Sequence, residues 1–491
     1  MGSCHQAAGR GCGSGAAPVR GECITGMDAV VEPTAEPLSN RVLDHIGENI
    51  FRCFQCLKCS AGCPLADEFD LMPNQIMRSL QLGDAEVLKS RAIWLCSSCY
   101  TCATRCPQGI DVTGVMDALR MEAHARGVTA AIPEIDRFNL LFLRFVHRFG
   151  RLPELLFLLA YNLLRGQPLR DMALGWRMIK RGKLKLLPRF AHTPKTVQVV
   201  ERPRDKVAYF PGCAAHSSAV EYDLTARTSA AALEIELIEP PGWTCCGAGA
   251  AHASDRTMAH EMPMRTMATI ERMGIDTVTS PCSNCFARLK VAEHSAVDDA
   301  SALDRVKVVT GHAYQGSVKV QHLLDTLLDR AGLATIAQRV RRPLAGLRVA
   351  CYYGCLITRP SQVTGADNPE YPMKMDNLLQ ALGAETVGWS YKTDCCGASL
   401  SVTQTPLSLK MSRKVVVDAQ ECGAEAVATM CPMCHLNLDA RQPEMELETP
   451  IPILQATQFM SLAFGFGAKG ARLGQNIVDP RPLLGLKNLL D

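Results

Sequence analysis

Cys245-Cys246-Gly247, followed by Cys282-Ser283-Asn284-Cys285, belongs to a cysteine pattern that occurs twice in this chain. Cys213 precedes this stretch and completes a first array of five thiols. The second array repeats the order with Cys355, Cys395-Cys396-Gly397 and Cys431-Pro432-Met433-Cys434. Between the cysteine pair and the CxxC lie 35 residues in the first array and 34 in the second. The matching order and spacing predict two copies of one domain.

Short apolar segments alternate with helical segments around both arrays, which is typical of a parallel α/β layer. The predicted strands lie near 206–210, 234–238, 277–279, 347–350, 385–387 and 426–429. Each motif cysteine lies at or after the carboxyl end of a predicted strand, and ligand sites of open α/β sheets form along that edge. The thiols of one copy are therefore expected to converge, and the two copies are expected to pack as a pseudo-twofold pair. Gly247 and Gly397 are expected to let the backbone turn closely around a bound cluster.

Five thiols in this order favour an iron–sulfur cluster. Two adjacent thiolates strain a tetrahedral four-ligand site, and they suit a larger or irregular cluster better. Zinc uses four ligands, and a disulfide between neighbouring cysteines is strained. Zinc and bare redox thiols remain the alternatives at this point.

A second kind of cysteine motif precedes the arrays and also occurs twice. It has the spacing of the bacterial-ferredoxin run, in which three cysteines wrap one cubane and the fourth, before proline, ligates the other. The first predicted [4Fe–4S] site has the ligands Cys53, Cys56, Cys59 and Cys106, and the second has Cys96, Cys99, Cys102 and Cys63. A Cys4 zinc site is the alternative, but zinc ribbons do not need a Cys-Pro in each half.

The rest of the chain divides by composition. Residues 1–40 predict a disordered tail that holds Cys4, Cys12 and Cys23, and 131–204 predict a basic, amphipathic helical linker. That linker is interpreted as packed on its own protein, as a membrane-surface helix, or as a docking face for a partner subunit. The predicted domains are 41–130 (α-helical ferredoxin domain), 205–310 (first α/β domain), 311–345 (helical connector) and 346–491 (second α/β domain and tail).

Bulk properties exclude several classes of protein. The 491 residues include 23 cysteines, carry a net charge of +3 and are 5% aromatic, so neither a strongly basic surface nor a base-stacking surface for nucleic acid is indicated. The start lacks a secretory pattern, and the most apolar run, 155–164, is about half of the roughly 20 residues that a spanning helix needs. A cytoplasmic protein without a transmembrane segment is predicted, in which the cysteines bind metal.

These features together resemble heterodisulfide reductase. The repeat resembles the cysteine-rich CCG domain of one of its subunits, on the turns Tyr209-Phe210-Pro211-Gly212-Cys213 and Tyr352-Tyr353-Gly354-Cys355 and on the tail 455–484. Residues 41 to about 190 resemble another of its subunits, which is ferredoxin-like and has two clusters. The chain therefore looks like a fusion of these two subunits.

The resemblance implies a fold and an activity. It implies a multidomain protein with an α-helical two-cluster ferredoxin domain, a helical linker and two CCG domains. Each complete five-cysteine array would hold a non-cubane [4Fe–4S] cluster, and a disulfide would be bound and cleaved between the two. The expected partners are a flavin and iron–sulfur subunit resembling that of heterodisulfide reductase and a disulfide or thiol substrate, with a homodimer of the complex also allowed.

The sequence leaves the direction of the reaction and the proton donor open. His216, Lys392 and His435 lie near motif cysteines and are candidate proton donors. Cys351 and Cys422 are left over and are interpreted as core cysteines. The alternative function is an electron-transfer subunit of a flavin- or quinone-linked dehydrogenase that performs no sulfur chemistry.

Overall fold

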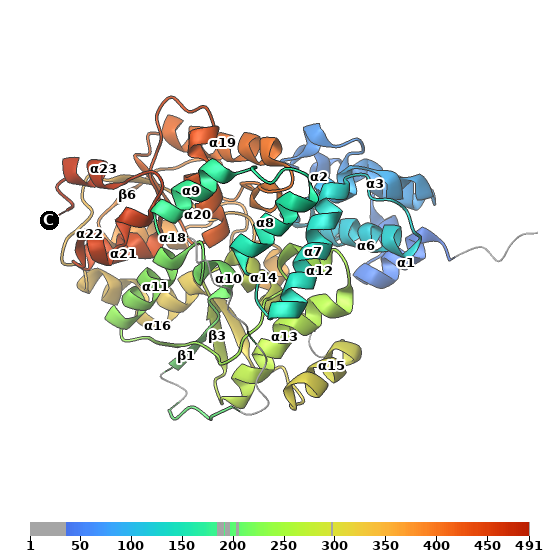
Figure 1. The fold of residues 1–491 in the computed structure, drawn as a ribbon, viewed down its shortest axis with the longest axis horizontal. Helices are drawn as coiled ribbons and strands as arrows, with labels where there is room; N and C mark the ends of the chain where they lie inside the picture. The colour runs from blue at the N-terminus through green and yellow to red at the C-terminus, as the bar shows by residue number, and fades with distance from the viewer. Residues whose placement is uncertain (1–35, 184–190, 192–196, 203–205, 296–297, 491) are drawn as a thin grey trace, which may run out of the picture. The chain divides into compact units, whose positions relative to one another are not determined.

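Two four-stranded parallel sheets form the C-terminal part of the computed structural model (Figure 1). The structure describes residues 36–183, 191, 197–202, 206–295 and 298–490. The first sheet has the order β2-β1-β3-β4 and the second has the order β6-β5-β7-β8, so equivalent strands take equivalent places. The strands are β1 Lys206–Tyr209, β2 Glu236–Ile238, β3 Thr277–Ser280, β4 Lys319–His322, β5 Arg348–Tyr352, β6 Glu385–Thr386, β7 Ala426–Thr429 and β8 Ile453–Gln455.

The structure corrects one predicted boundary. The stretch 311–345, predicted to be only a helical connector, contains α16 (Leu323–Gln338) but also β4, which pairs in parallel with β3. The prediction of helix alone is wrong there. A four-residue strand between polar neighbours gives little periodicity, and its pairing with a distant strand decides its conformation.

Helices surround both sheets, as the alternation of segments predicts. In the first α/β part they are α10 Gly212–Ala215, α11 Val220–Ala232, α12 Ala248–His252, α13 Arg256–Arg272, α14 Ser283–Ser295, α15 Ala300–Thr310 and α16. In the second they are α17 Ser361–Thr364, α18 Lys374–Ala381, α19 Thr405–Glu421, α20 Pro432–Ala440, α21 Ala456–Ala463, α22 Gly467–Gly470 and α23 Arg481–Leu486. Three 3-10 turns, η5 Ala398–Leu400, η6 Gln442–Glu444 and η7 Leu473–Gln475, complete that part.

The two α/β parts share one hydrophobic core. Helix α11 packs on α21, and α16 packs on α18. Tyr222 and Leu327 from the first part and Leu379 and Phe459 from the second belong to the same buried cluster. The Thr225 and Thr457 hydroxyls lie 2.8 Å apart across this contact. The two parts are therefore joined by apolar packing that is continuous with the core of each one.

The N-terminal part is helical. Its helices are α1 Leu38–Ile46, α2 Lys58–Ala61, α3 Pro73–Gln81, α4 Ala92–Leu95, α5 Thr101–Thr104 and α6 Val112–Ala125, with 3-10 turns η1 Ile50–Arg52, η2 Ala66–Glu68 and η3 Ala85–Lys89. The Asp70 carboxylate accepts hydrogen bonds from the Ser90 hydroxyl and the backbone N–H of Ala92. These bonds cap α4 and separate it from η3.

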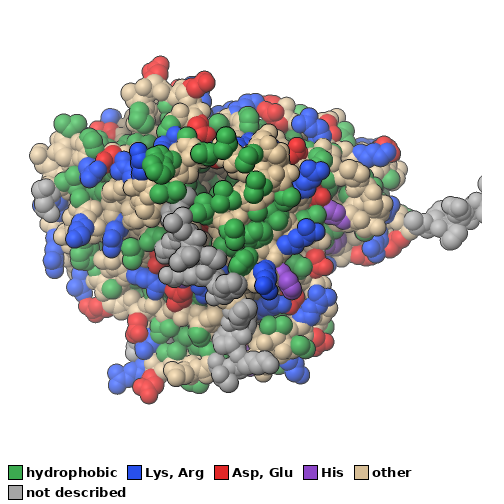
Figure 2. All heavy atoms as spheres, viewed as in Figure 1, with side chains coloured by type: hydrophobic (Ala, Val, Ile, Leu, Met, Phe, Trp, Pro, Cys, Tyr) green, Lys and Arg blue, Asp and Glu red, His purple; other side chains and the backbone are tan. Residues whose placement is uncertain are grey.

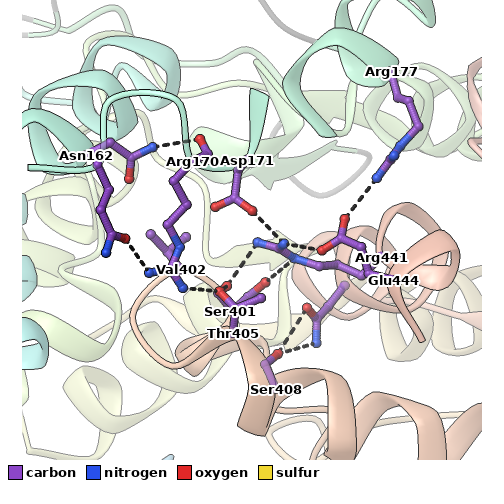
Figure 3. Close-up of polar contacts among 12 residues, drawn as sticks. Asn162, Arg170, Asp171, Arg177, Ser401, Val402, Thr405, Ser408, Arg441 and Glu444 are labelled. Atoms are coloured by element: carbon purple, nitrogen blue, oxygen red, sulfur yellow. Dashed lines mark hydrogen bonds and ion pairs between the residues drawn. The ribbon is translucent and has the colours of Figure 1, made fainter. Parts of the chain in front are cut away.

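Three helices, α7 Pro133–Phe149, α8 Glu154–Leu164 and α9 Met172–Lys180, continue from the ferredoxin part and cross to the second α/β part (Figure 1). Arg170 donates to the Thr405 hydroxyl at 2.9 Å, and Asp171 pairs with Arg441 at 2.7 Å (Figure 3). Farther on, the buried Lys183 ammonium pairs with the buried Glu221 carboxylate of α11. The helical segment is thus attached to both α/β parts. No helix of the described ranges is long and apolar enough to cross a membrane.

Candidate functional site: four sets of cysteines

The second ferredoxin motif surrounds a small cavity whose lining includes Cys63, Cys96, Cys99 and Cys102. Cys63 belongs to the first motif in sequence, yet the structure brings it to the three cysteines of the second. Ser98 and Tyr100 have φ values of 51° and 57°. This left-handed backbone is unusual for residues other than glycine and marks a site where the chain is held in a strained form. Here it turns the loop around the cavity.

The first ferredoxin motif repeats this geometry. Its small cavity is lined by residues that include Cys53, Cys56, Cys59 and Cys106. Gln55 and Leu57, at the positions equivalent to Ser98 and Tyr100, have φ values of 60° and 66°. The ferredoxin spacing predicts that the fourth cysteine of each motif lies with the first three cysteines of the other motif. The side chains are grouped in this way.

In the first five-cysteine array the thiols form a continuous chain of neighbours. Cys213 lies against Cys245, Cys245 against Cys246, and the Cys246 sulfur lies 3.4 Å from the Cys285 sulfur. Cys285 lies in turn against Cys282. All five sulfur atoms are thus brought together at the carboxyl edge of the first sheet.

The second array has the same arrangement. Cys355 lies against Cys395, Cys396 against Cys434, and Cys434 against Cys431. Burial is nearly complete for Cys395, Cys396, Cys431 and Cys434. The donor atoms of both arrays are sulfur alone, and soft thiolate ligands suit iron–sulfur clusters and zinc. Among the described residues, no group of three or more His, Cys, Asp or Glu side chains is arranged to hold a single metal ion.

The two arrays meet. Cys282, from the first CxxC, lies against Cys431, the equivalent cysteine of the second. The neighbouring Cys282 and Cys434 thiols lower the pKa of Cys431. Ten thiols of two α/β parts therefore form one continuous region with the Cys282–Cys431 contact at its centre.

Polar groups without partners surround that contact. The Tyr222 hydroxyl is buried and has no hydrogen-bond partner among the described residues. Burial, together with nearby Cys431 and Cys282, raises the pKa of Tyr222 well above its usual value. Within the same described ranges, His322 Nε2 is also buried without a partner. Orphaned polar atoms beside two sulfurs indicate that this junction is built to receive a further group. The sequence alone did not single out Tyr222 or His322, because nothing in the spacing of either links it to the cysteines.

The ferredoxin part approaches the second array through the loop of its second motif. Cys99 lies beside Cys395 and Cys355, and Cys395 packs in the same buried cluster as Ile93 and Leu95. The buried Arg359 guanidinium donates to the Thr101 hydroxyl at 2.7 Å and to the Thr393 hydroxyl at 2.8 Å. Arg359 thus joins the loop of the second ferredoxin motif to the loop of the second array.

The first array has a different cover. The Leu152 backbone N–H donates to the Cys213 sulfur at 3.4 Å, and the Cys245 N–H donates to the Gly150 carbonyl at 2.8 Å. Phe142 and Phe157, from α7 and α8, pack in one buried cluster with Cys245. This array therefore lies beneath the helical linker rather than beneath a ferredoxin loop.

The glycines that contact the thiols differ from those expected. A Cβ added at Gly247 would lie 2.6 Å from Ala251 Cβ, and one at Gly397 would lie 2.9 Å from Met411 Sδ, so both glycines face helices instead of the cysteine thiols. Both have positive φ, as a tight backbone turn requires, and their part in holding a cluster stays a prediction. Gly212 and Gly354 lie against thiols: a Cβ there would lie 2.8 Å from the Cys285 sulfur and 3.1 Å from the Cys434 sulfur. The available signal was that each glycine immediately precedes the lone cysteine of its array.

The candidate proton donors have partners of their own. Lys392 is buried and pairs with Asp376 at 2.7 Å, and His435 Nε2 bonds to the Ile453 carbonyl at 3.0 Å. Burial lowers the pKa of His435 well below its usual value. His216 lies 3.3 Å from Glu239. The contacts of Lys392 and His435 indicate structural roles.

Two described cysteines lie outside the four sets. Cys351 is buried within β5, as predicted, whereas Cys422 is exposed at the end of α19, so the prediction that it is a core cysteine is wrong. Cys4, Cys12 and Cys23 lie outside the described residues, as does most of the predicted tail.

Comparisons with known proteins match both kinds of motif. A family model described as a cysteine-rich domain, CCG, matches residues 207–290 and 349–439, and one described as a 4Fe-4S dicluster domain matches 49–110. A relative from Wolinella succinogenes, the 8-methylmenaquinol:fumarate reductase membrane anchor subunit, is 31% identical over 56% of this chain and 98% of its own length. One subunit of a CoB-CoM heterodisulfide reductase from Methanosarcina acetivorans is 28% identical over 56% of this chain and 94% of its own length.

The N-terminal part matches a different subunit. The iron–sulfur subunit of CoB–CoM heterodisulfide reductase from Methanopyrus kandleri is 40% identical over 21% of this chain and 51% of its own length. Among solved structures, a hypothetical protein from Helicobacter pylori shares the fold, with a TM-score of 0.59 and 10% identity over 91% of this chain and 76% of its own.

Proposed function

Since this chain belongs to the family of iron–sulfur proteins that includes two subunits of heterodisulfide reductase, we propose that it is an oxidoreductase acting on a disulfide. It would pass electrons from its ferredoxin part to a paired site at the Cys282–Cys431 contact. A disulfide would be cleaved, or formed, at that site. The observation that carries this proposal is the contact itself, because it joins two complete five-cysteine arrays into one region.

Four cysteine sets would hold four clusters. Two ferredoxin-type sets suit cubane [4Fe–4S] clusters, and the two five-cysteine arrays suit non-cubane [4Fe–4S] clusters. When bound, these groups supply one-electron transfer at potentials tuned by burial and hydrogen bonds. The chain contributes the order in which the sets lie and the groups that surround them.

The order of the cysteine sets indicates where electrons would enter the protein. Cys56 of the first ferredoxin set is exposed, and its neighbours Phe54 and Leu57 are 60% and 53% exposed. The second ferredoxin set is more buried, and its Cys99 lies beside Cys395. An electron-donating partner, such as a flavin and iron–sulfur subunit resembling that of heterodisulfide reductase, would therefore dock at the first set.

Reciprocal contacts support a pseudo-twofold relation between the CCG domains. Helices α11 and α18 follow equivalent strands, as do α16 and α21, and the pairs in contact are α11 with α21 and α16 with α18. Each domain thus offers the other the same two helices, which is the pattern of an isologous interface. Cys282 and Cys431 are equivalent residues that meet at the same interface. Two near-equivalent half-sites suit a substrate with two sulfur atoms.

The reaction would consume two electrons and two protons, converting R–S–S–R′ to R–SH and R′–SH. Tyr222 would donate a hydrogen bond to one of these sulfurs, because its buried hydroxyl has no other partner among the described residues. The sulfur atoms of the substrate would then satisfy a polar group that is otherwise orphaned.

The test is disulfide-dependent turnover of the anaerobic, cluster-loaded protein. The reduced protein should be oxidised by a set of low-molecular-weight disulfides, with a change in the electron paramagnetic resonance of the CCG sites. Cys431→Ser should remove this response, whereas Cys422→Ser, at an exposed cysteine outside the arrays, should retain it. If no disulfide perturbs the resonance of the parent protein, the proposal fails.

A second function is favoured by the Wolinella relative, whose name is that of a membrane anchor subunit of a quinol-linked fumarate reductase. In this case the CCG domains would carry electrons between a partner enzyme and a quinone without sulfur chemistry. Reduced protein that is reoxidised by a menaquinone analogue, and by none of the disulfides, would support this function over the first.

A further inference from the structure

Helices α8 and α9 of the linker each turn an apolar side away from the protein. Helix α8 also buries Phe157 and Tyr161 against the protein, whereas α9 is held to it by polar side chains. On α9, Arg177 bonds to the Glu444 carboxylate at 2.9 Å, and Asp171, at its start, pairs with Arg441 at 2.7 Å (Figure 3). At the end of α8, Arg165 donates to the Val402 carbonyl at 3.2 Å. The orientation of α9 is therefore the reverse of that of the usual amphipathic helix in a globular protein, whose apolar side faces the core.

The outward side is apolar with helical periodicity. Leu156, Leu159 and Leu163 recur on α8, and Met172, Trp176 and Ile179 recur on α9, at spacings of three or four residues. All six are exposed, Leu163 at 65% and Trp176 at 59%. Figure 2 shows hydrophobic side chains gathered over this part of the surface. We call these six residues the apolar face. Contiguous exposed apolar surface of this kind marks a site of interaction with a protein or a membrane.

The exposed charged side chains of the linker helices have one sign. Within residues 131–183, all of which the structure describes, the exposed charged side chains are Arg137, Arg144, Arg148 and Lys180. The four acidic residues of that range, Glu134, Asp136, Glu154 and Asp171, are all partly buried. The Lys180 ammonium lies 5.4 Å from the Trp176 ring centroid, so its aliphatic stem runs beside an exposed indole.

We propose that the apolar face is a monotopic membrane-binding surface that inserts into the interface of an anionic bilayer. Leucine, isoleucine and tryptophan on one side of a helix, together with arginine and lysine, are the composition that binds such surfaces. The four exposed basic residues of the linker, which we call the basic rim, match anionic headgroups, and the face needs no spanning helix. The polar contacts of Figure 3 hold α8 and α9 rigidly against the second CCG domain, so the face is presented without refolding.

The experiment is co-sedimentation of the full-length, cluster-loaded protein with vesicles. The parent protein should sediment with vesicles of phosphatidylcholine and phosphatidylglycerol, and more weakly with phosphatidylcholine alone. Leu159→Glu/Leu163→Glu should weaken binding to both by about tenfold or more, because two charged side chains would enter the apolar interface. Val308→Glu/Leu486→Glu is the matched control, since these apolar side chains are 82% and 84% exposed on other helices. It should bind as the parent does.

The contribution of the basic rim can be measured separately. Arg144→Gln/Arg148→Gln should weaken binding to the anionic vesicles by about fivefold per residue and leave binding to neutral vesicles unchanged. Trp176 supplies a direct readout, because Trp94, Trp243 and Trp389 are buried. Vesicles should shift the tryptophan emission to the blue, and Trp176→Phe should remove the shift.

Two results would overturn the proposal. One is a parent protein that sediments with neither kind of vesicle, as expected if the apolar face binds another protein instead. The other is a Leu159→Glu/Leu163→Glu variant that binds vesicles as tightly as the parent. Iron and sulfide content equal to that of the parent shows that each variant has folded.

Discussion

The two CCG domains have the same order of strands and the same order of cysteines, yet their arrays are covered by different elements. The lone cysteine and the cysteine pair of the first array lie beneath the turn between α7 and α8, where Gly150 and Leu152 bond to the array. Those of the second lie beneath the loop that holds Cys99. A repeated site thus becomes asymmetric because different elements cover its two halves, and Cys99 of the ferredoxin part lies beside the second array.

The strongest test of this asymmetry exchanges equivalent cysteines. Cys395→Ser should stop electron transfer from the ferredoxin part to both arrays, an effect larger than the about 100-fold that loss of a residue supporting a metal site typically causes. Cys245→Ser should alter only its own array. Rapid-mixing spectroscopy of cluster reduction measures both. If the two variants behave alike, the elements that cover the arrays do not decide the path of the electrons.

The interface between the ferredoxin part and the second CCG domain can be weakened at Arg359. Arg359→Ala removes a buried guanidinium that bonds to Thr101 and Thr393 and pairs with the Glu370 carboxylate at 3.2 Å, and it should lower the free energy of unfolding by about 3–5 kcal/mol. Arg288→Ala, at the side of the first array, should cost less, because Arg288 donates at 3.2 Å to the neutral Tyr100 hydroxyl. Denaturant titration under anaerobic conditions compares the two, and a larger loss for Arg288→Ala would contradict the comparison.

The glycines before the lone cysteines should distinguish the arrays more finely. Gly212→Ala should lower stability by about 2–3 kcal/mol, since a Cβ at positive φ would also lie 2.8 Å from the Cys285 sulfur. Gly354→Ala should have a smaller effect, because the equivalent distance is 3.1 Å. Gly311→Ala is the control for backbone strain alone, with φ +72° and open space around it. Cluster content per chain, measured with stability, should fall for Gly212→Ala and remain full for Gly311→Ala.

The smallest predicted effect concerns the junction that both domains share. Tyr222→Phe keeps the ring and removes a hydroxyl that has no partner among the described residues, so stability should change by less than about 1 kcal/mol while disulfide turnover falls by about tenfold. Steady-state assays with the cluster-loaded protein measure the turnover. An unchanged rate would remove Tyr222 from the site.

The sequence predicts the cysteine sets and most strands, because both depend on short-range spacing and local apolar runs. Strand β7 has the predicted bounds. The contact between Cys99 and Cys395 could not be predicted, since it results from the docking of surfaces far apart in the chain. The place of Tyr222 follows from the packing of α11 against α21, which no residue pattern encodes locally.

The helical linker shows a different limit of prediction from the sequence. Its basic and apolar residues are visible in the sequence, but periodicity alone does not tell which side of a helix faces the protein. That orientation is set by specific partners, such as Glu444 and Arg441, which lie more than 260 positions away. The orientation of α9 therefore becomes apparent only in three dimensions.

Carrying the ferredoxin part and both CCG domains on one polypeptide has a consequence for assembly. The interface contains Arg359 and the Arg105–Glu370 ion pair beside a buried apolar cluster, and between separate proteins its occupancy would depend on their concentrations. A linker secured at Lys183 and Glu221 makes the association intramolecular, with an effective concentration on the order of millimolar. The stoichiometry of donor and acceptor is then fixed at synthesis, and dilution in the cell does not separate them.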